Sequence, residues 1–374
     1  MYVAKGRTGV GGKIQLGHCG QGFRAVNLEP FQGQNMTLQA KKLLYLVIGL
    51  GISAVLLWVL FRNINFSELG TALKDANYLW LIPNVAFIFL TMYQRAYRWR
   101  AMVKPITHVT FQRLLAATCI GFMANNVLPL RLGEFVRAYS LASREKHITK
   151  SASLATIFVE RMVFDLVALL LIFGCILYFS DLSLDPGMVQ GLTIAVGIAL
   201  VGIMFILSLA LKPVQAGHLM TRYLFFVPDS VKESLEGIVM KFSRGLEFLT
   251  DFRSVASVGV QTLMIWLLMG FANIFVFKAF GLDLPLDAAY VVLVIVSISI
   301  LVPSSPGFVG VYHAGAVWSM MRYGVSQADA LSCALVLHAT QYIVVTLLGF
   351  YFLKKEHLSL KHLEEEASEG GEVT

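Results

Sequence analysis

Apolar runs separated by short polar links recur along this chain. A helix needs about 20 apolar residues to cross the hydrocarbon core of a bilayer, and most of the runs approach that length. The pattern therefore predicts an all-α membrane protein with six full crossings. They are Leu43–Phe61, Tyr78–Tyr93, Ser153–Phe179, Met188–Leu211, Val255–Phe280 and Leu331–Leu353.

Two further apolar runs, Phe111–Leu130 and Ala288–Met320, are interrupted by proline and glycine. Both residue types disfavour the interior of an α-helix. A break at membrane depth exposes backbone polar groups that lipid cannot satisfy, so it must face protein or a water-filled cavity. Basic residues flank the first run on both sides, which conflicts with a single crossing under the positive-inside rule. We expect each run to be a re-entrant helical hairpin.

The order of these elements predicts an inverted repeat. Each half holds two crossings, a hairpin and a third crossing, with all directions reversed in the second half. Pro129 and Pro303 are separated by as many residues as Gly133 and Gly307, so the two breaks align. Transporters built from inverted repeats place interrupted helices at corresponding points, with the substrate between them. The membrane part covers residues 43–354, with halves of about 43–180 and 188–354.

Composition agrees with a membrane protein and orients it. The chain is 57% hydrophobic and 14% charged, against about 25% charged in soluble domains. The second crossing ends in a basic cluster that we interpret as cytoplasmic interfacial anchors. We expect a multi-pass protein of the inner (plasma) membrane with both termini in the cytoplasm. The anchors are Arg95, Arg98, Trp99, Arg100 and Lys104, and the alternative for Arg95, Arg98 and Trp99 is contact with lipid phosphate.

Three segments differ from the membrane-spanning part. Residues 1–42 form a polar, Gly-rich extension that we expect to be disordered, with Met36 as an alternative start. Residues 229–252 carry apolar positions at helical spacing and charges on the opposite face, as in an amphipathic helix at the cytoplasmic interface or a simple loop helix. Residues 355–374 form an acidic cytoplasmic tail.

Charged residues around the first break are the leading candidates for function, because ionisable groups at membrane depth are costly and mark pathways or binding sites. Arg131, Glu134 and Arg137 follow at spacings of three and share one helix face. They predict a basic pocket for an anionic head group, with Glu134 holding the arginines. The alternative is an ordinary helix end with surface charges. Asn125 and Asn126 add polar groups before the break.

The crossing Ser153–Phe179 contains Glu160, Arg161 and Asp165. Arg161 and Asp165 are spaced i,i+4 and can pair, whereas Glu160 points elsewhere and needs its own partner, for which a hairpin arginine is the best candidate. Three charges inside a span must face the bundle interior. They belong either to a translocation site or to a structural ion-pair network.

The second break offers serine hydroxyls and free backbone N–H groups where a helix restarts, and such N-termini bind anions. His313 is interpreted as pore-lining or hydrogen-bonded rather than catalytic, and His338 and Gln341 as weaker candidates for lining a cavity. Pro129, Gly133, Pro303 and Gly310 are the structural helix breaks. The candidates in the second break are Ser304, Ser305, Pro306, Gly307, Tyr312 and His313.

Known motifs for catalysis, cofactors and metals are absent from the sequence. It contains no HExxH, GxSxG or ATP-binding loop, and its four cysteines form no CxxC pair. We therefore expect no cofactor, no metal, no catalytic residue and no nucleic-acid partner.

Four stretches resemble the lysylphosphatidylglycerol synthase transmembrane-region, or flippase-like, family: QRAYRWRAM, GFMANNVLPLRLGEFVRAYSLA, FVERMVFDL and ILVPSSPGFVGVYHAG. The resemblance implies binding or translocation of polar-headed lipids, such as aminoacylated phosphatidylglycerol, other phospholipids or polyprenyl-linked carriers. Since the sequence stops soon after Leu353, we expect a stand-alone member without the soluble synthase domain. The resemblance favours Arg131, Glu134, Arg137, Glu160, Arg161, Asp165, Pro306 and Gly307.

Three functions stay open from the sequence. The first is a lipid flippase or transporter. The second is an intramembrane lipid-phosphate transferase or hydrolase that uses Glu160 or Asp165 as its base. The third is a membrane partner that docks a separate cytoplasmic lipid-modifying enzyme through residues 212–253. Membrane lipids are the expected partners, and a homo-oligomer is also open.

Overall fold

The computed structural model describes residues 38–62, 64–179 and 242–369, with scattered positions between 190 and 240. The chain divides into two compact units, Met1–Lys41 and Lys42–Thr374, and the fold below is that of the second unit. The extension, most of the expected crossing Met188–Leu211 and most of the expected amphipathic helix lie outside the described residues. Where the end of that helix is described, the chain turns at Gly245 and Leu246 instead of continuing to residue 252.

The described part of the chain is an all-α, multi-pass membrane protein, as predicted. Four helical stretches are long and apolar enough to cross a membrane, and a fifth, α3, qualifies only together with α2 across a bend of 67°. The spans are α1 (Leu38–Phe61), α6 (Lys150–Val159) continued through a π-helical segment (Glu160–Asp165) into α7 (Leu166–Phe179), α11 (Phe252–Ala279), α14 (Gln327–Lys355), and α2 (Phe66–Asp75) with α3 (Leu81–Val103).

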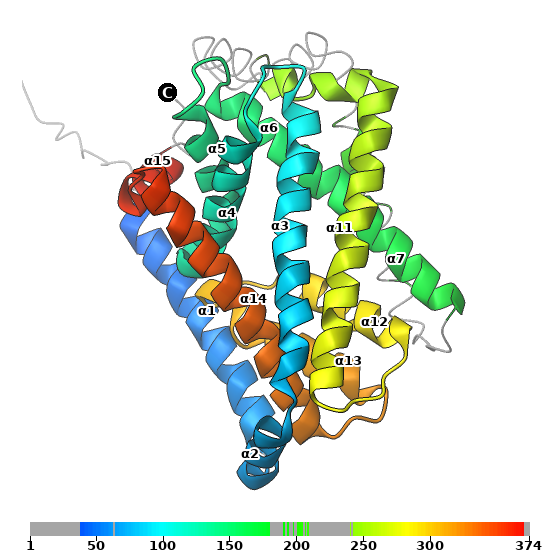
Figure 1. The fold of residues 1–374 in the computed structure, drawn as a ribbon. Helices are drawn as coiled ribbons and strands as arrows, with labels where there is room; N and C mark the ends of the chain where they lie inside the picture. The colour runs from blue at the N-terminus through cyan, green and yellow to red at the C-terminus, as the bar shows by residue number, and fades with distance from the viewer. Residues whose placement is uncertain are drawn as a thin grey trace, which may run out of the picture. The chain divides into compact units, whose positions relative to one another are not determined.

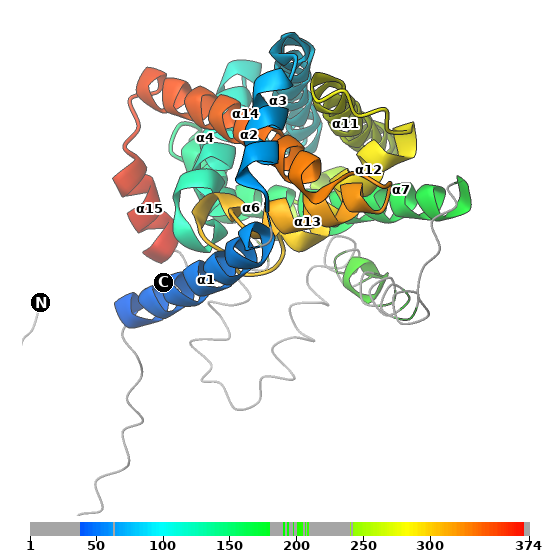
Figure 2. The ribbon, with the colours of Figure 1, turned by 90° about the horizontal axis from the view of Figure 1, so that it is seen from below.

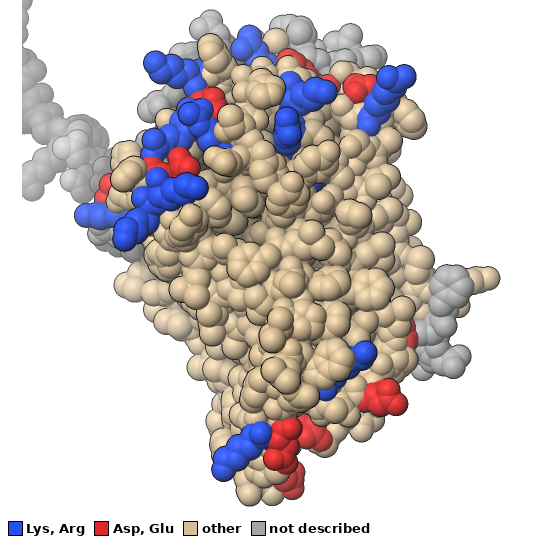
Figure 3. All heavy atoms as spheres, in the orientation of Figure 1, with Lys and Arg blue, Asp and Glu red and all other residues tan. Residues whose placement is uncertain are grey.

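On one face of the described part of the protein, charged side chains avoid the middle of the surface. Figure 3 shows a broad uncharged band on one face, with Lys, Arg, Asp and Glu gathered beyond its two edges. Large apolar side chains of the spans are exposed within the described residues, among them Trp58 of α1 and Leu347 of α14. Apolar surface of this kind is stable in lipid rather than in water.

The first broken run folds back on itself as a hairpin of α4 (Phe111–Val127), the 3-10 turn η2 (Pro129–Arg131) and α5 (Gly133–Ala142). The turn begins because Pro129 forces Leu128 out of the helical region, to ψ 146. The two arms approach closely because Gly121 and Gly133 face each other without side chains. A re-entrant hairpin was the expected form.

The second broken run is also a hairpin, made of α12 (Leu286–Ser299), the turn η5 (Pro306–Phe308) and α13 (Val311–Met321). Its turn has the same backbone conformation as the first one, because each begins with proline and continues through two residues of positive φ. These residues are Leu130 and Arg131 in the first turn, at 63° and 55°, and Gly307 and Phe308 in the second, at 72° and 61°. By backbone conformation, Pro129 in the first turn therefore corresponds to Pro306 in the second. The expected alignment of Pro129 with Pro303, and of Gly133 with Gly307, is wrong by three residues.

Each hairpin has its own apolar core, and long helices connect the two. One buried cluster joins α3 and α11 to the first hairpin and α6, and another joins α1, α2 and α14 to the second hairpin. Figure 1 shows α3 beside α11 and α14 crossing α4, and Figure 2 shows one end of α1 near the start of α13. Part of the expected acidic tail forms the helix α15 (Leu360–Glu369), which packs on α5.

Candidate functional site

Seven charged side chains gather where α3, α5 and the π-helical segment meet, and we call them the charge cluster. All three elements belong to apolar spans or to the first hairpin, so the charges lie among otherwise apolar helices. A π-helical turn adds one residue to the helix and is frequent at functional sites. The cluster consists of Arg95, Arg98, Glu134, Arg137, Glu160, Arg161 and Asp165.

Glu160 is the centre of the charge cluster. Its carboxylate accepts two parallel bonds from Arg137, at 2.9 and 3.1 Å, and Arg98 Nη2 lies 2.8 Å from its Oε1. The side chain is completely buried, at 0% exposure. The expected partner of Glu160, an arginine of the first hairpin, is thus present, and the pairing joins α5 to the π-helical segment.

Arg98 was expected to be an interfacial anchor, and this prediction is wrong. Its side chain is 0% exposed, and its Nη1 donates to Asp165 at 2.7 Å and to Thr262 of α11 at 2.8 Å. The prediction was also wrong for Arg95 and Trp99, which are buried beside it. Arg100, which points to the opposite side of α3, is exposed as expected. The same helix thus carries two buried and one exposed arginine.

Arg161 and Glu134 form the edge at which the charge cluster opens. Arg161 Nη1 donates to Asp165 at 3.1 Å, which is the predicted i,i+4 pair, and its Nε lies 3.7 Å from Glu134. About a quarter of each side chain is exposed, at 25% and 24%. A charged group that reaches the cluster would meet these two residues first.

Asn125 and Asn126 hold the first break rather than the charge cluster. Asn125 Oδ1 accepts from the Gly133 N–H at 2.8 Å, and its Nδ2 donates to Glu134 at 3.3 Å. Asn126 donates to Thr346 of α14 at 2.9 Å. Their amides therefore satisfy backbone and side-chain groups that a broken helix would otherwise leave unpaired.

Arg131 connects the tips of the two hairpins. Its Nη1 donates to the Ile300 carbonyl at 3.1 Å, and its guanidinium lies 5.3 Å from the Phe308 ring centroid. The side chain is exposed. The meeting point is strained, because Leu130, Arg131 and Phe308 are non-glycine residues at positive φ, each of which costs about 1–3 kcal/mol. Strain of this kind clusters at functional sites.

The two serines expected as site residues of the second break contact α1. The Ser305 N–H donates to Ser53 Oγ at 3.0 Å, and a side chain at Gly310 would collide with the backbone of Ser53. Ser304 likewise lies against Gly49. Helix α1 therefore covers backbone groups that were expected to be free for an anion.

Tyr312 and His313 form an aromatic group with α14 instead of joining the charge cluster. His313 Nδ1 accepts from the Gly310 N–H at 3.3 Å, and its Nε2 lies 3.3 Å from His338 Nδ1. The Tyr312 ring stacks on His338 with centroids 4.4 Å apart. His313 is thus hydrogen-bonded, one of the two expected roles, while Gln341 is exposed.

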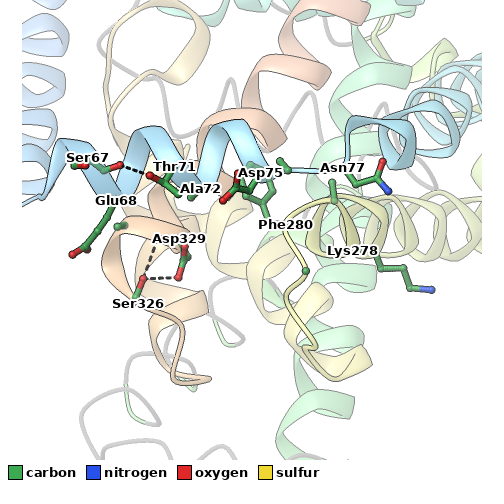
Figure 4. A pocket seen from close by; sticks show the side chains of 14 residues that line it. Ser67, Glu68, Thr71, Ala72, Asp75, Asn77, Lys278, Phe280, Ser326 and Asp329 are labelled. Atoms are coloured by element: carbon green, nitrogen blue, oxygen red, sulfur yellow. Dashed lines mark hydrogen bonds between the residues drawn. The ribbon is translucent and has the colours of Figure 1, made fainter.

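A surface pocket lies away from the charge cluster. It has a volume of about 630 Å³ and is lined by residues from α2, the end of α11 and the start of α14. Figure 4 shows Glu68 and Asp75 on α2 and Asp329 on α14 around it, with Lys278 at one side. None of its lining residues was predicted as a site residue, and none belongs to the charge cluster. The described residues contain no group of His, Cys, Asp and Glu suited to a metal.

Comparison with known proteins shows that the chain is similar to membrane proteins of a family whose name indicates a function related to membrane lipids. A family model described as "Lysylphosphatidylglycerol synthase TM region" matches residues 46–349. The protein named "Glycosyltransferase AglD" of Haloferax volcanii is 26% identical over 354 residues, covering 87% of this chain and 56% of its own length. A "UPF0104 membrane protein" of Methanothermobacter thermautotrophicus is 22% identical over 320 residues, covering 81% and 93%. The chain thus spans little more than half of AglD. No solved structure matches.

Proposed function

The chain belongs to the lysylphosphatidylglycerol synthase transmembrane-region family, and from this premise we propose that it moves polar-headed lipids across the inner membrane. The cargo is an anionic or aminoacylated phospholipid, or a polyprenyl-linked lipid. The family match and the relative named as a glycosyltransferase support a function connected with membrane lipids. The head group passes along the charge cluster while the tails stay in the bilayer.

One observation supports this proposal above the others: an arginine-rich cluster lies among apolar membrane helices and opens at a charged edge. Four arginines face three carboxylates. Guanidinium groups suit phosphate because they donate in a planar fork and keep their charge when buried. The strained tips of the two hairpins meet through Arg131, which offers a further exposed guanidinium beside the first break.

Replacing Arg131 with alanine should slow lipid flipping by about tenfold or more, since the lost charge-assisted hydrogen bonds are each worth about 1.5–3 kcal/mol. Stability should change little, because the side chain is exposed and pairs with no carboxylate in the described part of the chain. The measurement is the loss of fluorescently labelled phosphatidylglycerol from the outer leaflet of proteoliposomes. Arg100→Ala, an exposed arginine of α3, is the control and should flip lipid at the wild-type rate. A wild-type rate for Arg131→Ala would contradict the proposal.

The enzymatic alternative receives less support from the geometry. Glu160 and Asp165, the expected bases, bind three arginines between them and have their oxygens committed to these pairs. Incubation of the purified protein with labelled lipid distinguishes the two, because an enzyme changes the mass of the lipid and a transporter does not. The docking alternative depends on residues 212–253, most of which lie outside the described residues; loss of a co-purifying enzyme after their deletion would favour it.

A further inference from the structure

Arg95 is a buried cation with almost no partner. The residue is 5% exposed and lies on the face of α3 that carries Arg98. Its Nη2 donates to the Met269 thioether at 3.0 Å, and thioether sulfur is a weak acceptor. Within the described residues, its Nε and Nη1 are buried and have no hydrogen-bond partner. A buried charge is normally paired, because leaving it unpaired is costly.

The carboxylates of the charge cluster do not supply that partner. Glu160 binds Arg137 and Arg98, and Asp165 binds Arg98 and Arg161. Glu134, the third acid, lies beside Arg161. Every arginine of the cluster except Arg95 is therefore within 4 Å of an acid, and Arg95 accounts for the one positive charge that the cluster has in excess.

Arg95 lies next to the open edge of the charge cluster. Its guanidinium is 4.8 Å from the centroid of the Phe122 ring, and the guanidinium of Arg161 is 5.0 Å from the same centroid. Both guanidinium groups therefore lie against the same phenyl ring of α4. Arg161 is a quarter exposed, so an anion that enters at this edge meets Arg161 first and Arg95 behind it. Two adjacent guanidinium groups are an arrangement that suits a phosphate group.

We infer that Arg95, together with Arg161, binds the phosphodiester of a lipid head group inside the helical bundle. The inference rests on the proposed function and names the substrate-binding pair within it. The phosphate supplies the counter-charge that Arg95 lacks and accepts hydrogen bonds from its Nε and Nη1. Arg98 and Arg137 are positioning residues, since their side chains are only 0% and 2% exposed and their carboxylate partner Glu160 belongs to the segment that carries Arg161.

The test compares Arg95→Met with Arg100→Met in full-length protein that has been purified in neutral detergent and stripped of lipid. Both variants replace an arginine of α3 with an apolar side chain of similar length, but Arg100 is exposed. Phosphatidylglycerol should raise the melting temperature of the wild type and of Arg100→Met. Arg95→Met should bind it at least about tenfold more weakly, because charge-assisted hydrogen bonds are lost. Without lipid, Arg95→Met should melt no lower than the wild type, because an unpaired buried charge has been removed.

Each result supports or overturns the inference. The inference would be overturned if phosphatidylglycerol raised the melting temperature of Arg95→Met as much as that of the wild type. It would also be overturned if lipid-free Arg95→Met melted as low as Arg98→Met, because Arg95 would then be a structural residue. Uncharged diacylglycerol should have the same small effect on all variants. Inorganic phosphate should not replace the lipid; if it does, the site takes the free anion and the lipid assignment fails. The wild type could flip no lipid and still be stabilised by phosphatidylglycerol only when Arg95 is present. That result would refute the proposed transport and support the phosphate site.

Discussion

Replacing Glu160 with glutamine should destabilise the protein by about 3–5 kcal/mol, the usual cost of removing one partner from a buried ion pair. Glu160 is 0% exposed and accepts from both Arg98 and Arg137. The neutral amide would leave two buried guanidinium groups without their shared counter-charge. A Glu160 variant that fails to transport would therefore report lost folding as much as lost lipid binding.

Unfolding of the purified protein in increasing denaturing detergent measures this effect. Glu145→Gln is the matched control, because Glu145 pairs at 2.6 Å with Arg113, whose side chain is 46% exposed. Exposed pairs are worth about 0–1 kcal/mol, so this variant should stay close to the wild type. Adding Arg137→Gln to Glu160→Gln should recover part of the loss. Equal stabilities for Glu160→Gln and Glu145→Gln would show that the charge cluster does not hold α3 and α5 together.

Replacing Gly133 with alanine should force the arms of the first hairpin apart. The added methyl group would overlap the Gly121 carbonyl and the side chain of Asn125, which itself accepts from the Gly133 N–H. Overpacking of this kind costs about 1–3 kcal/mol, and we expect slower lipid flipping as well, because the hairpin carries Glu134 and Arg137.

Thermal unfolding and the proteoliposome assay together test the hairpin prediction. Gly174→Ala is the control, since Gly174 lies in α7 and a side chain there would meet nothing within 4 Å. Alanine is the better helix former by about 1 kcal/mol, so Gly174→Ala should be neutral or slightly stabilising. If Gly133→Ala behaves in the same way, the close contact between α4 and α5 does not limit the fold.

Local sequence signals predicted much of the fold and part of the candidate site. Apolar length located four of the six expected spans, and proline and glycine located both hairpins. The i,i+4 spacing predicted the pairing of Arg161 with Asp165, and the isolation of Glu160 on its helix predicted a hairpin arginine as its partner. These signals succeed because they depend on helix geometry and on the cost of leaving a charge unpaired inside a membrane span.

The buried arginines of α3 were missed because a basic run at the end of a span usually marks the membrane interface. A signal was present in the helical period. Arg95 and Arg98 share a face with Met92 and Met102, which is buried, while Tyr97 and Arg100 share the exposed face. The π-helical segment had no local signal, since it depends on how distant helices pack. The correct alignment of the hairpin turns did have one, because Pro306 and Gly310 are spaced like Pro129 and Gly133.

The burial of Arg98 also affects how the chain is inserted during synthesis. Arginine at the centre of a membrane helix raises the free energy of insertion by about 2.5–3.5 kcal/mol, and α3 carries three arginines and does not qualify alone as a span. Asp165, which neutralises Arg98, is made 67 residues later. We therefore expect α3 to be stable in the membrane only after the π-helical segment has been made.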